Sequence, residues 1–122
     1  LHRVDRRQRQ MCIRDRVMGM NLLRTTDRAD QKYTLAFVGY EQGNISGQAE
    51  IELTYNYGVE SYDIGTAYGH IAIGVKDIYK VCEDIKLAGG NVIRPAGPVA
   101  GGNTLIAFVQ DPDGYKIELI QK

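Results

Sequence analysis

The sequence predicts an α+β fold in which paired βαβββ units form one curved, mixed sheet and the first unit is incomplete. Two observations support this prediction. Residues 69–120 follow the order strand, helix, strand, strand, strand, which makes one complete unit. Residues 20–56 supply three further strands, so one preceding strand and helix would complete a second copy. Residues 1–16 stand where that missing piece would belong.

The bulk composition is that of a soluble globular domain. The 122 residues are 43% hydrophobic and 25% charged, which is ordinary for such a protein. No apolar run approaches the roughly 18 residues that a membrane span needs, so no membrane partner is expected. The two cysteines, Cys12 and Cys82, cannot form a disulfide framework, and this favours a reducing compartment, the cytoplasm.

The formal net charge of zero conceals a basic segment over residues 1–16, which holds six arginines and two aspartates. A basic arm can contact nucleic acid, but this one has no aromatic residue on which a base could stack. It also lacks the apolar region of a secretory signal. The run VDRRQRQMCIRDR resembles translated read-through of a sequencing adapter. We therefore interpret residues 1–16 as a segment foreign to a single domain over residues 17–122, and expect no nucleic-acid partner.

The first predicted strands lie over residues 20–26, 32–40 and 49–56. KYTLAFVGY is rich in residues that favour strands, and the glycines of EQGNISGQ predict a turn after it. AEIELTYN alternates between apolar and polar residues, which predicts a strand with one buried face. Glu52 and Asn56 lie on its polar face.

The second unit begins after a predicted loop over residues 57–68. In the strand GHIAIGV, His70 lies on the face opposite the alternating Ile71, Ile73 and Val75. Asp77 is placed to cap the following helix, whose end is predicted at Gly89 and Gly90. The apolar residues of that helix recur at helical spacing and define its buried face: Ile78, Val81, Cys82 and Ile85.

Three strands complete the second unit. We predict them over residues 91–94, 104–109 and 115–120, with a loop over residues 95–103. The DPDG sequence at residues 111–114 is a strong turn signal between the last two strands.

Three residues are candidates for chemistry: Glu52, His70 and Glu118. Each lies in a predicted strand, on the face opposite the residues that would pack against a helix. If the two units form one curved sheet, these side chains share its concave face. A carboxylate–imidazole–carboxylate set suits Ni²⁺, Co²⁺ or Zn²⁺. Taken singly, a strand glutamate is more often a solvated residue, and a lone histidine such as His70 is more often a hydrogen-bonded structural residue.

A family resemblance favours the metal-binding interpretation. The stretches VMGMNLLRT, KYTLAFVGY, IELTYN, GTAYGHIAI, AGGNVIRPAGPV and IAFVQDPDGYKIELI cover most of Val17 to Ile120. Together they resemble the short bacterial form of glyoxalase I (lactoylglutathione lyase), within the vicinal-oxygen-chelate superfamily. The resemblance implies metal ligands at Glu52, His70 and Glu118. It also implies that Asn56 contacts glutathione, although a polar residue at a strand end would look the same.

The implied activity is isomerisation of the hemithioacetal of methylglyoxal and glutathione to S-D-lactoylglutathione, which detoxifies methylglyoxal. The resemblance implies Ni²⁺ or Co²⁺ in preference to Zn²⁺, Glu118 as the main base and Glu52 as its assistant. It also implies a homodimer with shared metal sites, in which Glu52 of one subunit meets His70 and Glu118 of its partner. The alternative is another member of the fold, an epimerase or a metal-free small-molecule-binding or resistance protein. A dioxygenase would need two histidines and one carboxylate around iron.

The chain departs from the family pattern in two places. The family's fourth metal ligand is a histidine on the first strand. His2 does not stand at its spacing and no flanking motif aligns, so no ligand role is assigned to His2. A family arginine that binds glutathione is missing for the same reason, and Ala100 replaces a lysine common in related sequences. Impaired activity is therefore an expectation.

Overall fold

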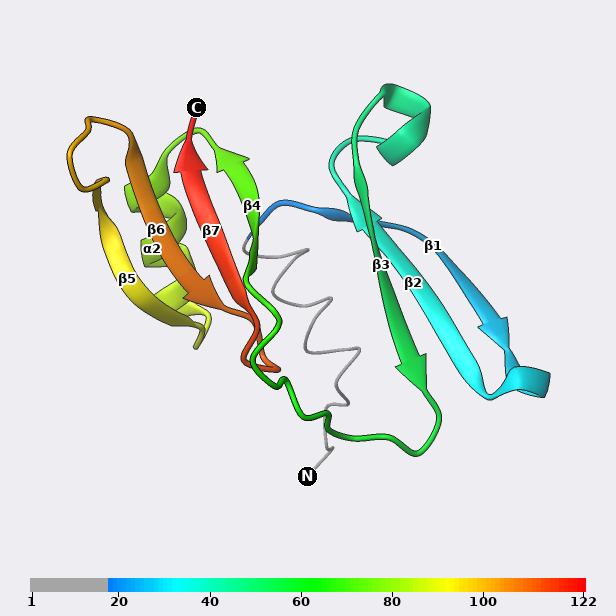
Figure 1. Ribbon diagram of the computed structural model, residues 1–122. Coiled ribbons are helices and arrows are strands. Elements are labelled where there is room, and N and C mark those ends of the chain that lie inside the picture. The colour runs from blue at the N-terminus through cyan, green and yellow to red at the C-terminus, as the bar shows by residue number, and fades with distance from the viewer. Residues whose placement is uncertain (1–17) are drawn as a thin grey trace. The chain divides into compact units, whose positions relative to one another are not determined.

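The computed structural model describes residues 18–122, and Figure 1 shows its elements. The chain divides into two units, one ending at Tyr62 and the other spanning Asp63–Lys122. The expectations for the basic segment at residues 1–16, including His2 and Cys12, lie outside the described residues.

The first unit contains a three-stranded antiparallel sheet in the order β1-β2-β3. Its strands are β1 (Asn21–Arg28), β2 (Tyr33–Gly39) and β3 (Glu50–Asn56). Short 3-10 helices, Ala29–Gln31 and Gly43–Ser46, make the two connections. The three predicted strands are confirmed, with β1 running two residues further than expected. In the described residues this unit has no counterpart of the strand and helix that would complete a βαβββ repeat.

An ion pair ties the second connection of this unit to its sheet. Arg24 donates from Nη2 to Glu50 Oε1 at 2.7 Å, and the Asn44 backbone N–H donates to Glu50 Oε2 at 2.8 Å. The Arg24 guanidinium also lies over the Phe37 ring, 4.1 Å from its centroid. These contacts leave the Glu50 side chain only 7% exposed, and they hold the pKa of its carboxyl below the usual range, first through Arg24 and then through the Asn44 N–H. Glu50 thus anchors the Gly43–Ser46 turn.

The second unit is a complete βαβββ unit with a mixed sheet. Its elements are β4 (His70–Val75), α2 (Ile78–Leu87), β5 (Asn91–Pro98), β6 (Leu105–Gln110) and β7 (Lys116–Gln121). The strand order is β4-β7-β6-β5. β4 runs parallel to β7, and the other neighbours are antiparallel. The predicted element order and the α+β class are confirmed.

Helix α2 covers one face of this sheet (Figure 1) and packs chiefly on β5, β6 and β7. Asp77 caps it by accepting from the Lys80 backbone N–H at 3.2 Å. The core between the helix and the sheet is built from both. The buried residues of the strands alternate with outward ones, as the sequence pattern predicted for residues 69–75. The strands contribute Ile73, Val75, Ala107, Val109, Ile117 and Leu119, and α2 contributes Ile78, Cys82 and Ile85. Ile71 was expected on the same face but is 39% exposed, because β4 lies at the edge away from the helix.

Cys82 is a free thiol buried on the inner face of α2. Burial raises the pKa of this thiol, and the nearby Lys86 only partly offsets the effect. The protonated form is therefore favoured at neutral pH.

Strand β5 continues to Pro98, where the sequence predicted a loop from Pro95 onward. Prolines are tolerated because β5 is an edge strand of the sheet. The Arg94 guanidinium supports this irregular stretch: Nη1 donates to the carbonyl oxygens of Pro95, Gly97 and Ile106 at 2.8–3.1 Å, and Nη2 to that of Pro98 at 2.8 Å. A side chain thus satisfies carbonyls that a regular ladder would bond.

Among residues 18–122, no helix is long and apolar enough to cross a membrane.

Candidate active site

The sheet of the second unit brings His70 and Glu118 together on the face away from α2. His70 is the first residue of β4, and Ala72 is the register partner of Glu118 on the parallel strand β7. The two side chains are therefore diagonal neighbours. His70 Nε2 lies 3.1 Å from Glu118 Oε2, a hydrogen bond between imidazole and carboxylate. The two side chains are 41% and 19% exposed, so both are accessible to a small ligand.

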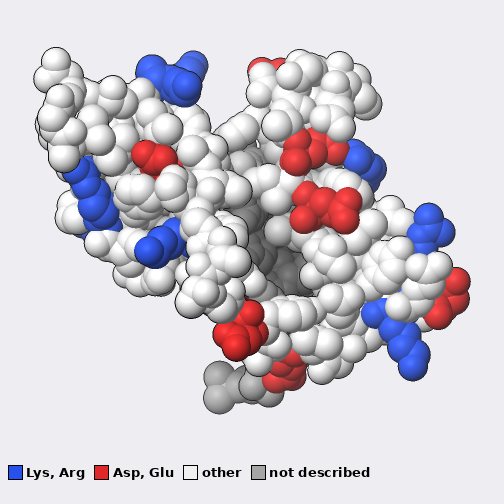
Figure 2. All heavy atoms as spheres, in the orientation of Figure 1, with Lys and Arg blue, Asp and Glu red and all other residues white. Residues whose placement is uncertain are grey.

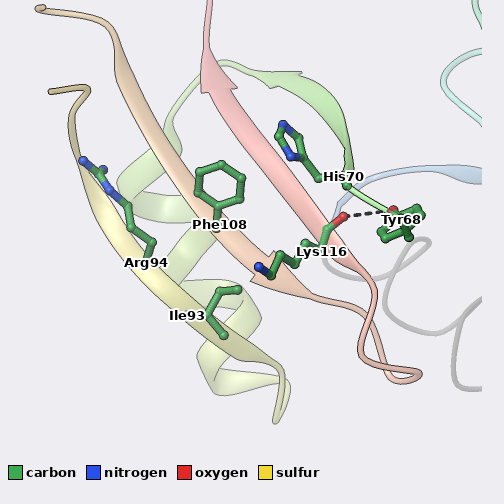
Figure 3. Close-up of a pocket in the computed structure, with 7 residues that line it drawn as sticks. Tyr68, His70, Ile93, Arg94, Phe108 and Lys116 are labelled. Atoms are coloured by element: carbon green, nitrogen blue, oxygen red, sulfur yellow. Dashed lines mark hydrogen bonds between the residues drawn. The ribbon is translucent and has the colours of Figure 1, made fainter. Parts of the chain in front are cut away.

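Phe108 holds the His70 ring from a second direction. It lies opposite Glu118 in the β6–β7 register, and its ring meets the imidazole edge-on, with centroids 5.1 Å apart and planes at 89°. Figure 3 shows both side chains on the same face of the sheet, with α2 behind it. The imidazole is thus positioned by one polar and one aromatic contact.

The segment before β4 is tied to β7. The Tyr68 hydroxyl donates to the backbone carbonyl of Lys116 at 3.1 Å (Figure 3). The Tyr68 ring also packs edge-on against Tyr115, with centroids 4.9 Å apart. These contacts fix the point at which the chain enters β4 and presents His70.

Glu52 and Asn56 belong to the other unit. Glu52 is an exposed residue of β3, paired in register with Phe37. Asn56 ends β3 and donates from Nδ2 to the Tyr62 hydroxyl at 2.6 Å. Of the predicted site residues, the structure thus joins His70 to Glu118 and describes Glu52 and Asn56 separately. Within the described part of the chain, no group of three or more His, Cys, Asp or Glu side chains is gathered closely enough to hold a metal ion.

A pocket of about 410 Å³ lies beside the His70–Glu118 pair. Its lining combines aromatic, apolar and cationic side chains on the four-stranded sheet: Tyr68, Gly69, His70, Ile93, Arg94, Phe108 and Lys116. Lys116 and Phe108 are not among the site residues predicted from the sequence. The alternation of YKIELI places Lys116 on the same strand face as Glu118, so that signal was available.

The surface around this pocket is mixed in charge. On the face seen in Figure 2, the four-stranded unit carries separate basic patches around a small acidic one, within a mainly uncharged surface. Such a surface suits a ligand with separate parts. Its negatively charged part would lie at the basic side chains, and another part would lie at the acidic group.

The comparisons with known proteins agree with this fold. Residues 15–119 match the sequence profile of the Glyoxalase/Bleomycin resistance protein/Dioxygenase superfamily, and the chain belongs to that superfamily. It is 66% identical over 105 residues to a lactoylglutathione lyase of Haemophilus influenzae, covering 86% of this chain and 76% of that protein. It is 59% identical over 119 residues to that of Salmonella typhimurium, covering 98% and 87%. Within the superfamily, the chain belongs to the lactoylglutathione lyases, or glyoxalase I.

Solved structures of the same family share the fold. Glyoxalase I from Zea mays superposes with a TM-score of 0.90 at 51% identity over 98% of this chain. This chain spans 42% of the length of the maize protein. The trypanothione-dependent glyoxalase I of Leishmania major superposes with a TM-score of 0.81 at 39% identity, covering 98% of this chain and 81% of that one.

Proposed function

We propose that this chain isomerises the hemithioacetal of methylglyoxal and glutathione to S-D-lactoylglutathione, and so detoxifies methylglyoxal in the cytoplasm. The observation that carries the proposal is the His70–Glu118 pair. In a chain 66% identical to a lactoylglutathione lyase, two side chains far apart in sequence meet at 3.1 Å on an accessible sheet face beside a pocket.

The donors present suit a divalent metal, and the family is metal-dependent. His70 Nε2 and Glu118 Oε2 converge from neighbouring strands, so modest side-chain rotation would let both bind one cation. Nitrogen and carboxylate oxygen together suit Ni²⁺, Co²⁺ or Zn²⁺, and we favour Ni²⁺ or Co²⁺. Two donors do not fill a coordination shell. We assign the third to Glu52, contributed within a homodimer by the second copy of the chain.

The hard step is removal of a carbon-bound proton next to a carbonyl. A bound divalent cation would stabilise the negative charge that develops on the substrate oxygens. Glu118 is the residue to which we assign transfer of the proton between the adjacent carbons, with Glu52 assisting. The hydrogen bond from His70, whose ring is held by Phe108, restricts the positions that the Glu118 side chain can take.

Asn56 is proposed to contact the glutathione portion of the substrate. Its Nδ2 already donates to the Tyr62 hydroxyl, which fixes the orientation of the amide. The amide oxygen and the second N–H can then pair with a peptide group of the substrate.

The reaction is tested by following thioester absorbance with methylglyoxal, glutathione and chelator-treated protein. We expect product only after addition of Ni²⁺ or Co²⁺, and we expect Glu118→Gln to abolish it without loss of the native fold. Glu83→Gln, an exposed residue of α2, is the matched control and should behave as the unmodified chain does. A Glu118→Gln variant with a near-normal rate would remove Glu118 as the base. Absence of product with every metal would contradict the enzymatic proposal.

A further inference from the structure

The pocket beside His70 contains two cations that form no ion pair with an acid among residues 18–122. Arg94 and Lys116 both line it. The ion pairs of the described residues involve other cations, namely Arg24, His70 and Lys80. Positive charge in a partly enclosed space favours an anionic ligand.

The two cations differ in what they can offer. Both terminal nitrogens of the Arg94 guanidinium already donate hydrogen bonds to backbone carbonyls of β5 and β6. It therefore shapes the wall of the pocket and adds to the positive potential, but most of its donors are already used. Substituting Arg94 would change the β5 backbone as well as the charge.

Lys116 keeps its donors available. Its backbone is fixed by the hydrogen bond from Tyr68 to its carbonyl oxygen, whereas its ammonium group makes no hydrogen bond or ion pair within the described residues. Figure 3 shows the side chain extending across the sheet toward Ile93 and Phe108. A lysine ammonium has three N–H donors and suits a carboxylate as a point charge.

We propose that Lys116 binds a carboxylate of the glutathione portion of the substrate in this pocket, with Ile93 and Phe108 contacting its apolar atoms. The proposal rests on the proposed function. Lys116 precedes Glu118 by two positions, and this separation spans about 7 Å along a strand. A ligand segment of a few covalent bonds spans that distance. The reacting carbons of one ligand can therefore lie at Glu118 while its carboxylate lies at Lys116. The role is one of substrate recognition and leaves the proton transfer to Glu118.

The first test separates binding from chemistry in the full-length, metal-loaded chain. We expect Lys116→Gln to raise KM for the glutathione hemithioacetal roughly tenfold, the scale of a charged hydrogen bond, with kcat nearly unchanged. Lys116→Arg should recover most of the affinity. Lys76→Gln, which removes an exposed lysine in the turn between β4 and α2, should leave KM unchanged. Esterifying one of the two glutathione carboxylates should remove the difference between Lys116→Gln and the unmodified chain. If neither ester does so, the proposal is overturned.

The second test does not need turnover. Calorimetric titration with S-methylglutathione, which cannot react, should show roughly tenfold weaker binding to Lys116→Gln. Thermal melting checks that the variant remains folded. Binding that depends on Lys116 in a chain without lyase activity would support the pocket and contradict the proposed function. Equal binding by the unmodified chain and Lys116→Gln, or no binding by either, would overturn the pocket even if turnover is normal.

Discussion

At the scale of single residues, His70 is held by contacts of different kinds. The carboxylate of Glu118 bonds its Nε2, and the Phe108 ring meets it edge-on. In the proposed metal site the polar contact would be exchanged for a bond to the cation, whereas the aromatic contact would remain. The orientation of the imidazole toward that cation would then depend on Phe108, a residue that has no donor atom.

Phe108→Leu tests this dependence. We expect weaker Ni²⁺ binding by several-fold in calorimetric titration, because the imidazole gains rotational freedom. The stability loss should stay near 1 kcal/mol, as for other swaps between large apolar residues. Tyr79→Leu removes an exposed ring of α2, the helix on the opposite face of the sheet from His70, and is the control. Unchanged Ni²⁺ affinity in Phe108→Leu would contradict the positioning role.

The ionisation of the Glu50 carboxyl makes the stability of the fold depend on pH. Arg24 and the Asn44 N–H hold the pKa of its carboxyl below the usual range in the folded state. The stabilisation is therefore present above the unfolded-state pKa and is lost as pH falls through the lower folded-state pKa. We expect Glu50→Gln to reduce the urea midpoint at pH 7 and to reduce it less at pH 3. Glu41→Gln, exposed on the same unit, should shift neither midpoint. An equal fall in the urea midpoint of Glu50→Gln at both pH values would contradict an ionic origin of this stabilisation.

At the scale of elements, the Gly43–Ser46 turn shows how closely a connection packs on its sheet. Gly43 has a φ of +63°, and an added Cβ would lie 2.3 Å from Glu50 Oε2 and 2.5 Å from Leu23 Cδ1. Gly47 has a similar φ of +77° but no atom within 4 Å of an added Cβ. A substitution at Gly47 therefore causes backbone strain alone, whereas one at Gly43 causes both backbone strain and a steric clash.

Alanine at each of these two glycines measures the difference. Gly47→Ala should cost about 1 kcal/mol from the left-handed backbone alone. Gly43→Ala should cost more, because it also displaces the carboxylate that anchors the turn. Urea unfolding of both variants gives the comparison. Equal losses would mean that the turn can move away from Glu50 without penalty.

At the scale of the whole molecule, the predictable parts are those set by local pattern. Alternation located β3 and β4, strand-favouring composition located β2, and the Asp77 cap with its helical apolar spacing located α2. The end of β5 could not be predicted, because Arg94 bonds the carbonyl of Ile106 across the sheet and no local signal encodes that contact. The ion pair between Glu50 and Arg24 also has no local signal, because it joins β3 to β1 across the intervening strand β2. The Lys116 pocket depends on the alignment of β5, β6 and β7, which sequence spacing leaves open. The assignment of Glu52 to the metal stays a prediction.

The proposed homodimer gives the whole molecule a metal-dependent assembly. If each site joins Glu52 of one copy to His70 and Glu118 of the other, metal stabilises the dimer by mass action. Sedimentation velocity should then show more dimer with Ni²⁺ than with excess chelator. Glu118→Gln, lacking one ligand, should respond less. The same dimer population under all these conditions would argue against shared sites.

The burial of Cys82 matters for a protein that handles a reactive aldehyde. Methylglyoxal is captured by glutathione through sulfur, and any accessible thiolate competes for it in the same manner. The inward position of Cys82 and its raised pKa leave little nucleophilic sulfur at the surface of α2. The sulfur of the helix is thus protected from adduct formation with this electrophile.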